Sequence, residues 1–217
     1  MAHLKRQLAP KNWPINRKGT AYVVRPNSNL EKGVPVLVIL RDMLKIAQNR
    51  KEVKRAINAK NVLLNNRIIK DEKNNAVLFD VITIVPAKKH YKITLSKYGK
   101  FDLEEVGEKE AMKKVSKVVN KKTLKGKKTQ LNLSDGRNLL SSEKCKTGDS
   151  VVISFKDKKI EKVLPMKEGE EVFIFAGKHA GKQGILRKLK IERKMASITV
   201  GEDNINVLIK QIMVVEK

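Results

Sequence analysis

The sequence predicts an α+β protein assembled from several small modules, and three observations point to this class. The chain of 217 residues can form one large domain or two to three small ones. Helical periodicity, confined mainly to one early stretch, gives way to short strand patterns. The 48 basic and 23 acidic residues give a net charge of +25. We expect four parts: a basic N-terminal arm (1–34), a helix-containing module (35–86), a β-rich central domain (87–165) and a C-terminal barrel (166–217).

The composition limits the classes of partner and site. A positive charge of this size attracts a polyanion, either nucleic acid or an anionic membrane surface. No apolar run approaches the ~18 residues of a membrane-spanning helix, and residues 4–10 do not form a signal-peptide core. Cys145 is the only cysteine, which excludes disulfides within the chain and cysteine-based zinc sites. We therefore expect a soluble cytosolic protein. Its low aromatic content (4%) favours a reader of RNA backbone and shape over a base-stacking binder of single strands.

The first 34 residues form a basic arm without a sustained period of either kind. Prolines and glycines interrupt regular structure, and Glu31 is the only acidic residue in this stretch. One interpretation is a disordered tail. Apolar residues such as Leu4, Trp13 and Tyr22 favour instead an arm that becomes ordered against RNA. Trp13 would pack on protein or on sugar and base, and His3 would contact RNA or solvent because no second metal ligand lies nearby in the sequence.

Residues 35–58 have the pattern of two helices. Pro35 suits the first position of a helix. Asn49 can cap the second helix, and Glu52 three residues later completes a capping-box-like pair. Arg41 and Lys45 flank the apolar stripe of the first helix, which consists of Val36, Leu37, Leu40, Met43, Leu44 and Ala47. The second helix has one apolar face and an opposite basic face of Lys51, Lys54, Arg55 and Asn58.

A hairpin and a closing strand complete this module. The predicted hairpin strands, 62–64 and 67–69, flank Asn65 and Asn66, because asparagine tolerates the positive φ of a tight turn. An apolar strand interrupted by Asp80 follows at 77–85. Two helices with a basic face, a short hairpin and a closing strand resemble the S-four RNA-binding domain, also called the alpha-L motif. Lys60 and Asn66 stand where members of that family often have glycine.

Short strands predominate from residue 86 to about residue 165. We expect a strand at 91–95, a helix at 108–119 and a lysine-rich loop at 121–128. The run Ser134-Asp135-Gly136-Arg137 is a good hairpin signal between strands at 131–133 and 138–140. Two further strands, 151–155 and 160–164, should pair with each other. The region is thus a small, mostly β domain with one helix. Its lysine run is either a solvated loop or a segment that contacts phosphate.

Residues 169–186 contain a strand, a loop of glycines and basic residues, and the start of another strand. This arrangement resembles the KOW motif. Tight turns and close approach to a phosphate chain are permitted by Gly177, Gly181 and Gly184. Positive charge is supplied by Lys178, His179 and Lys182. Strands at 196–200, 205–208 and 212–215 would complete a small SH3-like barrel. The alternative is a barrel whose glycine loop is only a turn, and a phosphate-binding P-loop is excluded because the spacing is too short and Gln183 replaces Ser or Thr.

The order of these parts resembles one family over the whole chain. It is the small-subunit ribosomal protein four of the archaeal and eukaryotic type, the S-four-e family. The landmarks are His3-Leu4-Lys5-Arg6, Ala9-Pro10-Lys11-Asn12-Trp13, Arg25-Pro26, Val38-Ile39-Leu40-Arg41, Glu52-Val53-Lys54, Asp80-Val81-Ile82 and Asp135-Gly136-Arg137. The chain stops soon after the predicted barrel, without the basic tail of eukaryotic members, which favours an archaeal member. The resemblance implies a cytoplasmic, structural component of the small ribosomal subunit. Its expected partners are small-subunit ribosomal RNA (rRNA) and neighbouring ribosomal proteins, with no small-molecule substrate.

The residues themselves favour a non-enzymatic role. The three histidines are far apart in sequence, and no metal-spaced pair, nucleophile elbow or dinucleotide fingerprint occurs. Asp80 raises the alternative of an RNA-modifying enzyme such as a pseudouridine synthase, but little chain is left for a catalytic domain. A surface or turn-bonding carboxylate is the favoured interpretation of Asp80. A second alternative is a transcription or translation factor that carries a KOW barrel and binds the ribosome transiently. We predict no catalytic residue, metal or cofactor.

The expected mechanism is electrostatic and geometric. Basic side chains would contact rRNA phosphates and release counterions, while rigid modules would recognise the shape of the RNA. The candidate rRNA-binding residues are Lys5, Arg6, Lys11, Trp13, Arg17, Arg25, Arg41, Lys45, Lys51, Lys54, Arg55, Arg67, Lys178, His179 and Lys182.

Overall fold

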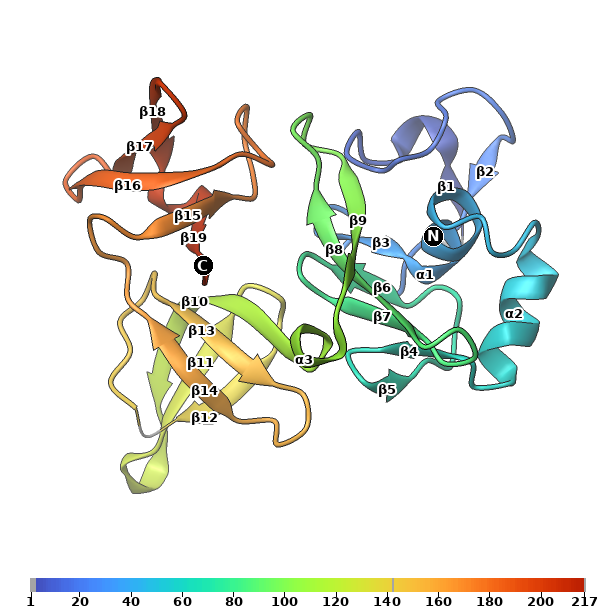
Figure 1. The fold of residues 1–217 in the computed structure, drawn as a ribbon, viewed down its shortest axis with the longest axis horizontal. Helices are drawn as coiled ribbons and strands as arrows, with labels where there is room; N and C mark the ends of the chain where they lie inside the picture. The colour runs from blue at the N-terminus through green and yellow to red at the C-terminus, as the bar shows by residue number, and fades with distance from the viewer. Residues whose placement is uncertain (1–2, 142, 217) are drawn as a thin grey trace. The chain divides into compact units, whose positions relative to one another are not determined.

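The computed structural model describes residues 3–141 and 143–216 and shows a β-rich chain with few helices (Figure 1). The chain divides into two compact units. Unit 1 comprises Met1–Ser96 and Lys100–Met112, and unit 2 comprises Lys97–Gly99 and Lys113–Lys217. The predicted boundary between residues 86 and 87 lies inside unit 1. Strands β7 (Val81–Ile84) and β8 (Lys89–Leu95) stand on either side of that boundary and pair antiparallel, so it does not separate two compact units.

Unit 1 contains an antiparallel sheet of five strands in the order β5-β4-β7-β8-β9, together with the strand pairs β1-β2 and β3-β6. The remaining strands are β1 (Leu4–Lys5), β2 (Tyr22–Val23), β3 (Gly33–Pro35), β4 (Val62–Leu64), β5 (Arg67–Ile68), β6 (Asn75–Val77) and β9 (Phe101–Val106). The helices are α1 (Val36–Val38), α2 (Arg50–Asn58) and α3 (Glu108–Ala111). A 3₁₀ turn, Arg6–Leu8, lies in the arm.

The first predicted helix is shorter than expected. After α1 the chain continues as a π-helical turn, Ile39–Met43, in which the Leu44 amide donates to the Ile39 carbonyl at 2.9 Å. Lys45 then adopts φ +54° and ends the helical segment. Lys45 therefore lies in a turn and not on the flank of a helix.

The second helix is confirmed with its cap. The Asn49 side chain accepts from the Glu52 amide at 3.0 Å, and the Glu52 carboxylate accepts from the Gln48 amide at 2.7 Å. Val53 and Ile57 are buried, whereas the basic side chains of α2 are exposed. The amphipathic pattern thus places α2 with its apolar side on the unit and its charged side in solvent.

Replacing Lys60 with glycine should stabilise unit 1 by about 1 kcal/mol, because Lys60 leads out of α2 at φ +59°. Its amide donates to the Ile57 carbonyl at 2.9 Å, and glycine keeps this bond. Denaturant unfolding followed by helical circular dichroism would measure the gain. Lys54→Gly is the control, since Lys54 lies inside α2 and glycine there should destabilise. A loss of stability in Lys60→Gly would contradict the prediction.

The predicted hairpin is confirmed, but the strand that follows is interrupted. Asn65 and Asn66 take φ +51° and +59°, as a two-residue turn requires. The strand expected at 77–85 breaks at Phe79, which has φ +61°. The Asp80 carboxylate closes this turn by accepting from the Val77 amide at 2.8 Å. Asp80 is only 4% exposed, so the turn-bonding interpretation is confirmed and the surface alternative is wrong.

Unit 2 consists of two antiparallel five-stranded sheets. Their strand orders are β12-β11-β10-β13-β14 and β18-β17-β16-β15-β19. The first sheet contains β10 (Lys113–Thr123), β11 (Thr129–Leu133), β12 (Asn138–Ser141), β13 (Ser150–Ser154) and β14 (Ile160–Leu164). The second contains β15 (Glu171–Ile174), β16 (Gln183–Lys190), β17 (Met195–Val200), β18 (Asp203–Leu208) and β19 (Ile212–Val214). Lys125–Lys127 and Ile209–Gln211 form 3₁₀ turns.

The helix predicted at 108–119 is wrong over most of its length. Only Glu108–Ala111 is helical, and β10 begins at Lys113. The same strand extends to Thr123, so it also occupies the start of the predicted lysine-rich loop. β10 pairs with β13 through residues 113–117 and with β11 through residues 118–123. β-branched valines fit a pleated strand, and pairing with two distant strands outweighs the local helical spacing.

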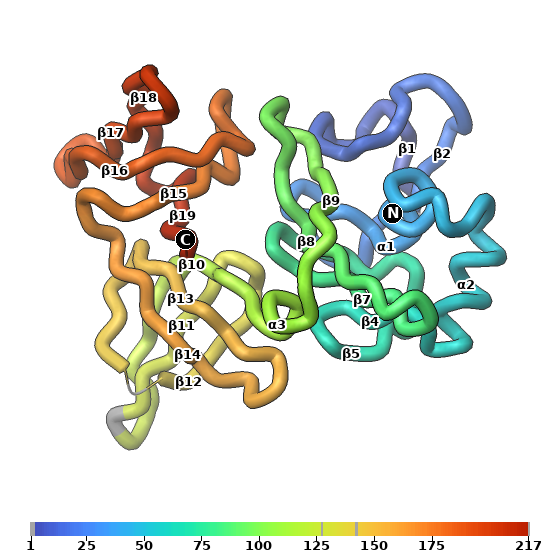
Figure 2. The backbone as a smooth tube through the Cα atoms, in the orientation of Figure 1, coloured from blue at the N-terminus to red at the C-terminus, as the bar shows by residue number. Residues whose placement is uncertain are grey.

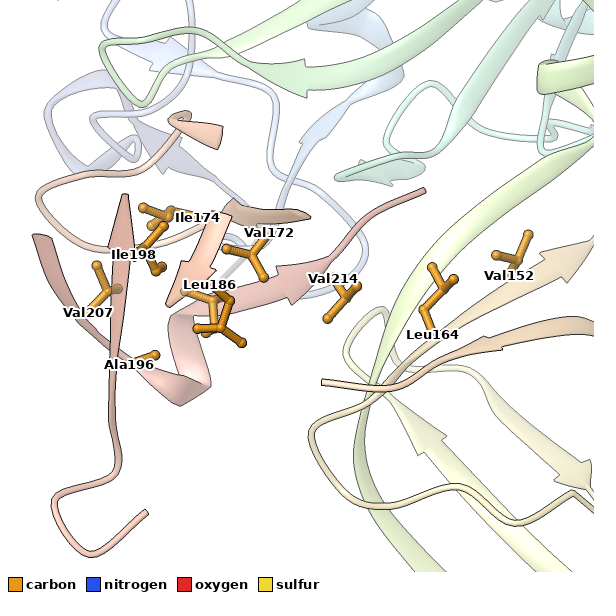
Figure 3. Close-up of a cluster of buried hydrophobic side chains, with 10 residues drawn as sticks. Val152, Leu164, Val172, Ile174, Leu186, Ala196, Ile198, Val207 and Val214 are labelled. Carbon is orange, nitrogen blue, oxygen red and sulfur yellow. The ribbon is translucent and has the colours of Figure 1, made fainter. Parts of the chain in front are cut away.

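The two sheets of unit 2 share one core. Val152 and Leu164 from the first sheet join a buried apolar cluster formed by the second sheet (Figure 3). The buried Ser150 hydroxyl accepts from the Val214 amide at 3.0 Å. The buried Lys117 ammonium donates to the carbonyl oxygens of Ile209 and Ile212, the latter at 2.8 Å. These contacts join the two sheets into one compact unit.

The stability of unit 2 should rise between about pH 8 and pH 10. Burial lowers the pKa of Lys117 to about 8, whereas a lysine in an unfolded chain titrates near ~10.4. In this window the unfolded chain binds a proton that folded Lys117 has released, so unfolding becomes less favourable as pH rises. We expect a gain on the order of 2 kcal/mol relative to a Lys117→Met variant, measured by denaturant titration at pH 7, 8, 9 and 10. Lys156→Met, an exposed-lysine control, should follow the wild type. Parallel pH profiles of wild type and Lys117→Met would contradict the prediction.

Candidate nucleic-acid interface

The arm is anchored on protein through Trp13. The indole is 2% exposed, and its N–H donates to the Gly33 carbonyl at 2.9 Å. Of the two alternatives for Trp13, the structure shows packing on protein. Its inclusion among the rRNA contacts is therefore corrected, because a side chain so buried offers no surface to RNA. The residue positions the arm instead.

Arg6 has a similar structural role. Its guanidinium donates to the Asn16 carbonyl, the Thr20 carbonyl and the Thr20 hydroxyl, each at 2.7 Å. These bonds close the loop of residues 16–20 onto the start of the arm. Arg6 is half-buried, and most of its donors are occupied by protein. The neighbouring basic residues Lys5, Lys11, Arg17 and Arg25 are exposed, and so is His3, whose ring centroid lies 5.5 Å from that of Tyr22.

The helical module combines neutralised and exposed cations. Arg41 forms a two-pronged ion pair with Asp42 at 3.0 and 2.8 Å, and this hydrogen bonding raises the pKa of Arg41. On α2, Lys54 lies 3.8 Å from the buried carboxylate of Glu72, which also binds Arg50 at 2.9 Å. On α2 and β5, the exposed cations without a partner among the described residues are Lys51, Arg55 and Arg67. Lys51 and Arg55 belong to the basic face that the sequence predicted.

A groove of 840 Å³ lies between the arm and the first helical segment (the arm groove). Its cationic side chains are Arg6, Lys18, Arg41 and Lys45, and its one carboxylate is Asp42. Figure 2 shows the arm running beside the segment that carries α1. A second hollow of 560 Å³ is lined by Lys11, Arg17 and Lys100, among others. Lys18 and Lys100 were not among the contacts predicted from the sequence. For Lys18, the high density of basic residues around it in the sequence could have indicated a contact.

The glycine loop of unit 2 connects β15 to β16. Gly177 and Gly181 take φ +90° and +89°, and the Gly181 amide donates to the Ile174 carbonyl at 2.8 Å. Lys178 is exposed on this loop, whereas His179 and Lys182 are half-buried. Gly184 has a different role, since a Cβ there would overlap the Thr199 carbonyl of β17. Its lack of a side chain serves strand packing and not approach to a phosphate.

Among the described residues, no group of three or more His, Cys, Asp or Glu side chains is placed to hold a metal ion. In that part of the chain no helix is both long and apolar enough to cross a membrane. Cys145 is buried in the apolar core of the first sheet of unit 2, and burial raises the pKa of its thiol. The candidate nucleic-acid contacts are therefore the exposed cations of the arm, of α2 and of the glycine loop.

Comparison with known proteins identifies the family. A model described as ribosomal family S4e matches residues 87–160, and a model of the RS4NT domain matches residues 2–28. The small ribosomal subunit protein eS4 of Methanocella arvoryzae is 37% identical over 201 residues, which cover 91% of this chain and 85% of that protein. The chain belongs to the ribosomal S4e family. The eS4 of Archaeoglobus fulgidus is 38% identical over 196 residues, which cover 89% of this chain and 83% of that protein.

A solved structure supports the same assignment. The crystal structure of the 30S ribosomal protein S4e from Thermoplasma acidophilum is similar to this S4e chain with a TM-score of 0.74 and 25% identity. The match covers 85% of this chain and 95% of that one. The family and its archaeal affinity are thus confirmed, as is the expectation of a ribosomal protein that is not an enzyme. The alternatives of a transient factor and an RNA-modifying enzyme are not favoured.

Proposed function

We propose that this S4e chain is a structural constituent of the small ribosomal subunit that binds small-subunit rRNA, contacts neighbouring ribosomal proteins and supports subunit assembly. Membership of a family of small-subunit proteins carries this proposal. The net charge of +25 and the exposed cations of both units support rRNA as the principal partner. Phosphate contacts would then supply most of the affinity and make it dependent on salt.

Finer parts of the proposal concern the modules. We propose that residues 35–86 act as an alpha-L-type RNA-binding module and residues 166–217 as a KOW-type, SH3-like barrel, with the arm (1–34) and the central domain (87–165) as the other two functional parts. The capped α2 followed by the Asn65–Asn66 hairpin supports the first assignment. The five-stranded order of the second sheet of unit 2 and its glycine loop support the second.

The proposed rRNA contacts are the exposed or half-buried members of the predicted set other than Arg6. They are Lys5, Lys11, Arg17, Arg25, Arg41, Lys45, Lys51, Lys54, Arg55, Arg67, Lys178, His179 and Lys182. Arg6 and Trp13 are assigned to the positioning of the arm. This division rests on their hydrogen bonds to main-chain carbonyls.

Gradient sedimentation of ribosomes in low and in moderate salt, followed by immunoblotting for this chain, tests the proposed function. A structural constituent should co-migrate with the small subunit in both conditions. Recovery at the top of the gradient in both conditions would overturn the proposal and favour a transient factor. A combined variant, Lys51→Gln with Arg55→Gln, should retain its fold and enter subunits less efficiently, because both side chains are exposed on α2.

A further inference from the structure

The arm groove contains two cations that have no partner among the residues that the structure describes. Arg6 is engaged by Asn16 and Thr20, and Arg41 is engaged by Asp42. Lys18 and Lys45 also line the groove, and both are exposed. Within residues 3–141 and 143–216, neither ammonium group has a hydrogen-bonding or ionic partner. The groove therefore presents two ammonium groups that the described residues leave without a partner, and Arg6, which is bonded only to neutral groups, adds a third positive charge.

These two lysines come from the two segments that form the groove. Lys18 belongs to the loop that Arg6 closes, and Lys45 to the left-handed turn that ends the first helical segment. Apolar side chains, including Val23, Val38 and Ala47, also line the groove. Cations beside apolar surface suit a nucleic-acid strand, whose phosphates bind ammonium groups while its sugars and bases cover the apolar part.

We propose that the arm groove holds the phosphodiester backbone of a single RNA strand, with Lys18 and Lys45 each binding one phosphate. This inference rests on the proposed function and adds to it a specific site made jointly by the arm and the helical module. Arg6 then acts as a positioning residue, because it fixes the loop that carries Lys18. Trp13 positions the same arm through Gly33.

Lys45→Gly and Lys18→Gln are the informative variants. Glycine at residue 45 removes the charge and also relieves the φ of +54°, so the variant should melt no lower than the wild type. A loss of RNA affinity in this variant is then not a consequence of unfolding. Lys158→Gly is the matched control, since Lys158 is an exposed lysine at φ +55° outside the groove.

Binding of the full chain to a transcript of the small-subunit rRNA, measured between about 50 and about 200 mM salt, tests the site. Each groove variant should bind about fivefold more weakly and lower the slope of log affinity against log salt by about 0.7, the value for one phosphate of a single strand. The double variant should lower it by about twice that amount. Lys158→Gly should change the slope less than either groove variant does.

Equal slopes for the groove variants and Lys158→Gly would overturn the RNA site while leaving the proposed function intact, provided that the wild type binds the transcript. Failure of the wild type to bind would overturn both. If the groove variants bind the transcript as the control does but fail to enter small subunits, the groove holds a neighbouring protein, and the assignment to RNA is wrong.

Discussion

Lys114→Met should destabilise unit 2 by about 3–5 kcal/mol, the expected cost of removing one partner from a buried ion pair. The Lys114 ammonium lies 3.0 Å from Asp135 Oδ2, and the two side chains are 1% and 4% exposed. The remaining carboxylate would keep the more distant Arg137 at 3.6 Å and the Arg137 amide at 3.0 Å. Neither contact with Arg137 substitutes for the buried ammonium group that Lys114 supplied. Denaturant unfolding at pH 7 measures the effect.

Lys113→Met is the matched control for this variant. Lys113 is the adjacent residue on β10, but its ion pair with Glu161, at 2.6 Å, is on the surface. The control should change stability little. Adding Asp135→Asn to Lys114→Met should recover part of the loss, because it removes the unpaired charge. Equal effects of Lys113→Met and Lys114→Met would contradict the prediction.

The cost of Lys114→Met should also shrink in acid. Burial alone would raise the pKa of Asp135, but Lys114 and Arg137 together hold it below the usual value. The carboxylate thus contributes stability above the unfolded pKa of ~3.9 and loses it as the pH falls through the folded value. In the variant, the unpaired carboxyl binds its proton at a higher pH. The difference between the two proteins should therefore be smaller near pH 4 than at pH 7.

Asp80→Ala should destabilise unit 1 by about 2–4 kcal/mol, since it leaves one buried and one partly buried donor without an acceptor. The Asp80 carboxylate accepts from the Asn65 side chain and the Val77 amide, both at 2.8 Å. The side-chain oxygen of Asn65, Oδ1, in turn accepts from the Val81 amide at 3.0 Å, so the loss would also loosen the hairpin. Hydrogen exchange of the Val77 and Val81 amides, together with denaturant unfolding, measures the effect.

Asp102→Ala serves as the control for Asp80→Ala. Asp102 is an exposed carboxylate of the same unit, on β9, and its removal should cost little. Asp80→Asn should be intermediate, because an amide offers one acceptor where the carboxylate offers two. If Asp80→Ala is as stable as the wild type, the structural role assigned to Asp80 is wrong.

The sequence determined the features that depend on neighbouring residues along the chain. The cap of α2 needs only Asn49 and Glu52, three residues apart, and it formed as predicted. Asn65 and Asn66 specify a tight turn by themselves, because their side chains tolerate positive φ. The excess of lysine and arginine predicted a polyanionic partner without any knowledge of the fold. The order of these local patterns was sufficient to indicate the family.

Tertiary structure decided what depends on distant partners. Residues 113–119 became part of β10 because β11 and β13 offered hydrogen bonds and burial that a lone helix of the same residues would lack. Trp13 and Arg6 are not among the proposed RNA contacts, because Gly33, Asn16 and Thr20 accept their hydrogen bonds. The sequence shows which side chains are basic, but it does not show whether a carboxylate or carbonyl group will lie close enough to bind them. Only the fold separated Arg6 and Arg41, whose guanidinium groups bind other parts of the chain, from Lys18 and Lys45, whose ammonium groups have no partner among the described residues.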